Sequence, residues 1–162
     1  MFQNEGELER HVRNMIATAI TAHHPNIYAL DNKKAVDIVI CRDSPAPALF
    51  FLETKLYQSG HGRIHIGTGK GAGHQPEILL KKPGYFETNL RWIIVDGRLT
   101  EPRYVFVTNE IVRRYLAGSG IGDKFNNIQT RIFREVSGIN EPSLIQELRT
   151  FLVPAAQSVA TG

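Results

Sequence analysis

The stretch ALFFLETKLY, residues 48–57, decides how the fold is interpreted, because it combines an apolar run with two charges. Its branched and aromatic residues predict a β-strand. Glu53 and Lys55 stand two positions apart, and side chains alternate along a strand, so both belong to one face. Charged side chains are rarely buried without a partner, so a strand of this apolar character needs a reason to carry them.

A second strand is predicted directly upstream, at AVDIVICR, residues 35–42. The intervening DSPAPA contains two prolines and is typical of a turn. If residues 43–47 form the loop of an antiparallel hairpin, Arg42 pairs with Ala48. This register then fixes the partner of every other residue in the hairpin.

In this register Asp37 falls directly opposite Glu53, where side chains on one face are about 5 Å apart. A slip of one residue would move Asp37 to the other face. That other face is apolar, and both faces are covered along most of their length, so we expect inner strands with the charges at an opening of the sheet. The apolar face carries Val36, Ile38, Ile40, Phe50, Leu52 and Thr54.

Two carboxylates this close repel each other unless a cation lies between them. Mg²⁺ prefers oxygen ligands and is typically held by one or two carboxylates. Such an ion activates water and neutralises charge on a phosphate, and a lysine beside it positions the water or stabilises the transition state. The constellation therefore predicts phosphodiester hydrolysis. A structural ion pair between Lys55 and Asp37 or Glu53 is the alternative.

The pattern Val36-Asp37 followed by Glu53-Thr54-Lys55 on the next strand resembles the PD-(D/E)XK nuclease superfamily. The resemblance implies a restriction-endonuclease-like α/β core, with a central mixed β-sheet flanked by α-helices. It also implies that Asp37 and Glu53 bind the metal, with the Thr54 carbonyl as a third ligand, and that Lys55 is catalytic. Val36 stands where the family name has proline.

Two further residues follow from the resemblance. Some members add an acidic residue from the first helix, for which Glu9 is the first candidate and Glu5 the second. Other branches carry a glutamine on the helix after the catalytic strand, and Gln75 lies 20 residues beyond Lys55. The alternatives are solvated charges at a helix start for the glutamates, and a residue near a helix N-cap for the glutamine.

Basic residues near the predicted site are candidates for DNA contacts, because Lys and Arg neutralise backbone phosphates. The glycine-rich segment 67–73, GTGKGAG, fits neither the phosphate-loop nor the dinucleotide fingerprint, so it predicts a flexible loop that approaches DNA. Turn charges and a polar surface loop are the alternative. The candidates are Lys33, Lys34, Arg63, Lys70 and His74.

The remaining pattern predicts one sheet flanked by helices in a single domain over residues 1–153, with a flexible tail at 154–162. Strands are expected at 91–97 and 103–108, with a short one in RIHIG, residues 63–67. Helices are expected at 5–22, 75–82, 109–117, 123–137 and 142–152.

Composition limits the class of protein further. The chain has 162 residues, 42% hydrophobic, a net charge of +3 and one cysteine, Cys41, and its pI is about 9.1. These values are typical of a globular domain in a reducing cytoplasm. No apolar run reaches the roughly 18 residues of a membrane span, so no membrane association is expected.

Together these features predict a Mg²⁺-dependent DNA endonuclease of the type II restriction kind, for which Mn²⁺ could substitute. Its expected partners are double-stranded DNA and a second copy of itself in a homodimer. A Holliday-junction resolvase-like or repair nuclease is the alternative within enzymes. A catalytically inactive nuclease-fold DNA-binding module is the alternative from another class.

Overall fold

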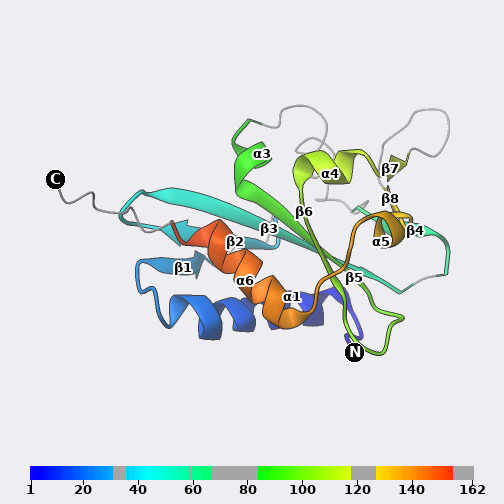
Figure 1. Cartoon of the computed structure of the whole chain (residues 1–162), viewed down its shortest axis with the longest axis horizontal. Coiled ribbons are helices and arrows are strands. Elements are labelled where there is room, and N and C mark those ends of the chain that lie inside the picture. Colours follow the sequence, from blue (N-terminus) through cyan, green and yellow to red (C-terminus); the bar gives the residue numbers. More distant parts are fainter. Residues whose placement is uncertain (31–35, 59, 67–83, 118–126, 155–162) are drawn as a thin grey trace.

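The ten-residue strand β3 lies in the middle of a mixed five-stranded sheet with the strand order β1-β2-β3-β5-β6. Strands β1, β2 and β3 are antiparallel, β5 is parallel to β3, and β6 is antiparallel to β5. The computed structural model describes residues 1–30, 36–58, 60–66, 84–117 and 127–154 (Figure 1). The strands are β1 Ile27–Leu30, β2 Ile38–Arg42, β3 Ala48–Tyr57, β5 Leu90–Asp96 and β6 Tyr104–Thr108.

Helices α1 (Glu5–Ile16) and α6 (Glu141–Leu152) cover one face of this sheet (Figure 1). Apolar residues at helical spacing dictate this packing, and a turn of π-helix, η1 (Ala17–Thr21), continues α1. The core on this face includes Leu8, Val12, Ile16, Ile38, Ile40, Leu52, Ile93, Leu144, Leu148 and Leu152, each at most 1% exposed.

The opposite face packs against α3 (Gly84–Asn89), α4 (Asn109–Arg113), α5 (Ile132–Glu135) and a small second sheet. That sheet has the order β4-β8-β7, with β4 Arg63–His65, β7 Leu116–Ala117 and β8 Asn127–Gln129. The core between the two sheets and these helices includes Trp92, Ile94, Val105, Ile64, Ile128 and Ile132. The sheet is therefore a middle layer, buried on both sides.

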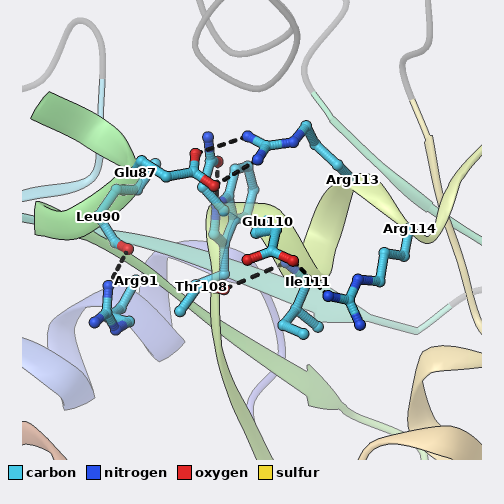
Figure 2. A network of polar contacts seen from close by, with 10 residues as sticks. Glu87, Leu90, Arg91, Thr108, Glu110, Ile111, Arg113 and Arg114 are labelled. Carbon is cyan, nitrogen blue, oxygen red and sulfur yellow. Dashed lines mark hydrogen bonds and ion pairs between the residues drawn. The ribbon is translucent and has the colours of Figure 1, made fainter. Parts of the chain in front are cut away.

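Polar contacts join α3 to α4 on this second face (Figure 2). Arg113 donates to the Glu87 carboxylate at 2.7 Å, and Arg114 pairs with Glu110 one turn away. Beneath them the buried indole of Trp92 donates to Asn109 Oδ1 at 3.1 Å. These contacts tie the start of β5 to the helix that follows β6.

The structure corrects three expectations about the elements. The helix predicted at 109–117 ends at Arg113, and Leu116–Ala117 forms β7 instead. Within the described part of the helix predicted at 123–137, residues 127–137, the chain forms β8 and the four-residue helix α5 instead, because Ile128 pairs with Ile64 and Leu116 in the second sheet. The expectation of one sheet is consequently wrong. Strand β1 and helix α3 were not expected.

Most other elements are confirmed, and the coarse class is an α/β fold with a mixed sheet flanked by helices. The predicted helix at 75–82 and residues 155–162 of the predicted tail lie outside the described residues. Among the helices that the structure describes, none is both long and apolar enough to cross a membrane.

Strand β3 carries a buried and an exposed leucine, which offer a matched test of how its residues are packed. Leu52 is fully buried against Ile38, whereas Leu49, three positions earlier, is 40% exposed. We expect Leu52→Ala to lower the free energy of unfolding by about 3 kcal/mol, because the cavity stays open. We expect Leu49→Ala to change it by about 0.5 kcal/mol or less. Urea denaturation measures both, and equal losses would contradict this assignment of the core.

Candidate functional site

The register of the β2–β3 hairpin brings Asp37 toward the charges on β3. Arg42 pairs with Ala48 as predicted, and the ladder ends at Ile38 opposite Leu52. Asp37 lies just before β2, and its Oδ2 accepts hydrogen bonds from the amide and the hydroxyl of Thr54, both at 2.7 Å. The carboxylate is thus held beside β3 by side-chain hydrogen bonds rather than by the strand ladder.

Because the β2–β3 ladder ends at Ile38, a residue that precedes it lies on a different face of the sheet from the one predicted. Val36 was expected on the face of Ile38 and Ile40, but it packs into the core of the opposite face with Val39. Strict alternation applies only within the strand, and Val36 precedes it. Beyond Leu52, the described strands pair with β3 only on its β5 side. The charged side chains gather along the other edge of β3, which β2 no longer covers.

Three carboxylates meet at this flank. One oxygen each from Glu5, Asp37 and Glu53 lies within 4.8 Å of the others. Glu53 is 1% and Lys55 4% exposed, while Asp37 is half-buried. The Lys55 Nζ lies 2.7 Å from a carboxylate oxygen of Glu53 and 2.7 Å from one of Glu5. The cluster therefore sets three carboxylates against one ammonium.

Burial and charge shift the protonation of both buried groups. Burial raises the pKa of Glu53 to about 8; the charges of Asp37 and Glu5 act in the same direction, and Lys55 acts against them. Burial disfavours the charged form of Lys55, but the carboxylates of Glu53, Glu5 and Asp37 outweigh it and raise the pKa of the ammonium. Lys55 is thus a cation at neutral pH.

Helix α1 supplies a different acidic residue from the one ranked first by sequence. Glu9 accepts a hydrogen bond from Arg13 Nε at 2.9 Å, and its carboxylate is not part of the cluster within the described residues. Arg13 in turn donates to the main-chain carbonyl of Asp37. Glu5, the second candidate, is the residue that reaches Lys55. Glu9 therefore orients Arg13, which positions Asp37.

Arg13 was not singled out in the sequence, although a signal for it is present. Glu5, Glu9 and Arg13 are spaced four apart, so they form one stripe along the helix beside its apolar face. Such a stripe on a helix that packs next to the hairpin marks the residues able to reach Asp37.

Arg63 and Thr54 are the remaining predicted site residues that the structure describes. Arg63 is an exposed residue of β4 in the second sheet. Thr54 is fully buried and holds Asp37 through its amide and hydroxyl. Five predicted residues lie outside the described residues: Lys33, Lys34, Lys70, His74 and Gln75.

Comparisons with known proteins gave no significant match to this chain among family models, curated proteins or solved structures. The chemistry of the cluster must therefore be derived from its own geometry. Oxygen donors from three carboxylates suit a hard divalent cation such as Mg²⁺ or Mn²⁺. Soft ligands are absent from the cluster, so it does not suit a thiolate-bound metal.

The raised pKa of Glu53 makes stability depend on pH. Between pH 4.5, its usual pKa, and about 8, the folded protein retains a proton that the unfolded chain releases. The free energy of unfolding therefore falls as the pH rises through this window. In EDTA, we expect the free energy of unfolding of the wild type to fall between pH 5 and 8 by more than about 1 kcal/mol relative to that of Glu53→Gln. Glu101→Gln, at an exposed position, controls for the loss of one carboxyl, and a pH-independent difference between wild type and Glu53→Gln would contradict the assignment.

The two glutamates of α1 allow a direct test of which one binds metal. Removing a carboxylate that lies next to a bound cation weakens the attraction strongly, so we expect Glu5→Gln to weaken Mn²⁺ binding by about tenfold or more. Glu9→Gln should have the smaller effect, because Glu9 acts only through Arg13. Isothermal titration calorimetry measures both affinities, and a larger loss for Glu9→Gln would reverse the two roles.

Proposed function

We propose that this protein is a divalent-metal-dependent phosphodiester hydrolase that acts on DNA as an endonuclease. The observation that carries the proposal is the charge of the acidic cluster, in which Glu53 is buried, Asp37 half-buried and Glu5 exposed. Glu5, Asp37 and Glu53 bring up to three negative charges within 4.8 Å, and Lys55 supplies one positive charge. Arg13 does not alter this balance, since its guanidinium is paired with Glu9. A divalent cation would complete the neutralisation.

The charge balance also weighs against the structural alternative. A buried ion pair needs one carboxylate for one ammonium, and Glu53 alone would satisfy Lys55. The additional carboxylates of Asp37 and Glu5 raise the pKa of Glu53, which is a cost to the ionised cluster. A cluster whose carboxylates repel one another is typical of a functional site rather than of a structural contact.

In the proposed reaction each residue has a separate task. Asp37, Glu53 and Glu5 would hold the metal ion, which when bound activates water and offsets charge on the phosphate. Thr54 and Arg13 keep Asp37 in place, through its carboxylate and its main-chain carbonyl respectively. Lys55 is protonated, so it acts as a hydrogen-bond donor and a positive charge toward the phosphoryl oxygens rather than as a general base.

The topology supports a restriction-endonuclease-like core. A helix, a mixed sheet that includes a strand parallel to β3, and further helices are compatible with the α/β core that the resemblance implies. Asp37 lies just before β2 and Glu53 lies within β3, as in the D…ExK pattern. A restriction-type enzyme acting on double-stranded DNA as a homodimer remains our preferred form of the proposal.

A plasmid assay tests the activity. We expect the purified protein to cut supercoiled DNA in Mg²⁺ or Mn²⁺ and to be inactive in EDTA. Asp37→Asn, Glu53→Gln and Lys55→Ala should each lower the rate by about 10²-fold or more, because each removes charge stabilisation at the phosphate. Glu101→Gln should cleave like the wild type. Uncut DNA in both metals would sink the proposal and favour the inactive binding module.

The ends of the products separate the two kinds of nuclease. Digestion of a long defined DNA followed by sequencing of the ends should give fixed termini if the enzyme is of the restriction type. Termini that appear only at four-way junctions would instead identify a resolvase-like or repair enzyme.

A further inference from the structure

A second candidate site lies where α6 crosses β5 and β6, on the face of the sheet that α1 and α6 cover. It is a pocket of about 350 Å³, in the size range of small-ligand sites. Phe50, Phe106 and Phe151 form its apolar wall. The ring centroids of Phe50 and Phe151 are 5.0 Å apart and those of Phe106 and Phe151 6.3 Å apart, both with edge-to-face geometry. Phe50 is 5% exposed, whereas Phe106 and Phe151 are half-buried, so these two rings offer the aromatic surface on which a flat apolar group would pack.

A cation is fixed at this aromatic wall. The guanidinium carbon of Arg91 lies 4.4 Å from the centroid of the Phe151 ring. Its Nη1 donates to the carbonyls of Thr88 and Leu90, both at 2.9 Å, and the second of these bonds appears in Figure 2. One side of the guanidinium is thus immobilised by main-chain acceptors and one face by an aromatic ring.

The rest of the Arg91 guanidinium has no acceptor in the described part of the chain. Neither Nε nor Nη2 donates to a protein oxygen there, and no described carboxylate pairs with this arginine. Figure 2 shows Glu87 and Glu110 engaged by Arg113 and Arg114, away from Arg91. Burial lowers the pKa of the Arg91 guanidinium, and no carboxylate of the described residues acts to raise it.

A second arginine adds to the positive charge of this region. The Arg42 guanidinium carbon lies 5.0 Å from the centroid of the Phe50 ring, and the group donates to the carbonyls of Ala46 and Leu152. At the rim, Glu147 and Thr150 offer a carboxylate and a hydroxyl. The pocket combines an aromatic wall, a fixed cation with free donors, and hydrogen-bonding groups at its mouth.

We propose that this pocket binds a small aromatic anion of the nucleoside monophosphate type. The anionic group would accept from the Nε and Nη2 donors of Arg91, since arginine forms paired hydrogen bonds with phosphate and carboxylate. The ring would pack on the phenylalanines, as bases do on aromatic side chains. Glu147 and Thr150 would hydrogen-bond to the base or sugar. This inference is independent of the proposed nuclease activity, because the pocket and the acidic cluster share no residue.

Calorimetry in EDTA tests the site without metal at the acidic cluster. The probes are AMP, benzoate and inorganic phosphate. We expect AMP to bind about tenfold or more tightly than inorganic phosphate, because phosphate cannot use the aromatic wall. Benzoate binding as tightly as AMP would support the same aromatic-anion site and assign it to a carboxylate ligand. No heat from AMP or benzoate at millimolar concentration would overturn the proposal.

Two arginines of similar chemistry give the matched variants. Arg91→Met should weaken AMP binding by about tenfold or more, because the anion loses its paired donors. Arg149→Met, on the exposed surface of α6, should leave the affinity within about twofold, since that guanidinium contacts only the Ala19 carbonyl. Equal affinities for the wild type and Arg91→Met would overturn the proposal.

A second variant guards against a folding defect in Arg91→Met. Thr150 is exposed at the rim and hydrogen-bonds only to the Gln146 carbonyl one turn earlier. Thr150→Trp should therefore keep the melting temperature of the wild type while its bulk closes the pocket and abolishes AMP binding. Unchanged AMP affinity in a folded Thr150→Trp protein would place the ligand elsewhere and overturn the proposal.

Discussion

The contact on which the candidate site depends is the buried pairing of Lys55 with Glu53, 2.7 Å apart on one face of β3. Both side chains are almost completely excluded from solvent, where an unpaired charge costs far more than at the surface. The pairing lowers that cost. The neighbouring carboxylates of Asp37 and Glu5 act in the opposite direction, because their charges raise the pKa of Glu53. The apolar strand therefore contributes to a cluster in which three carboxylates face one ammonium.

The fold creates room for this arrangement by ending one strand early. The β2 ladder stops at Ile38, whereas β3 continues along β5 as far as Tyr57. The main chain of β3 then lacks a strand partner on one side, and the Asp37 carboxylate takes that place at the Thr54 amide. The same interruption lets the start of α1 bring Glu5 to Lys55.

Local patterns were sufficient for the parts of the site that one hairpin determines. The alternation in β3 and the turn length together predicted the pairing of Arg42 with Ala48, which the structure confirms. The contribution of α1 depends on how the helix packs against the hairpin, so sequence alone ranked Glu9 above Glu5. The second sheet was missed for a related reason. Strand β4 was expected within residues 63–67, but β7 and β8 have only two or three residues, too few for an alternation signal. They form through contacts between distant segments such as Ile64 and Ile128.

Alternation along β3 also separates two regions of opposite chemistry. Phe50 and Glu53 are three positions apart and therefore point to opposite faces of the strand. Phe50 belongs to an aromatic wall that carries Arg42 and Arg91, while Glu53 belongs to the carboxylate cluster. The strand thus keeps the Phe50 ring apart from the Glu53 carboxylate. The two regions share no side chain, and each is assembled from a different helix, α6 at the aromatic wall and α1 at the carboxylates.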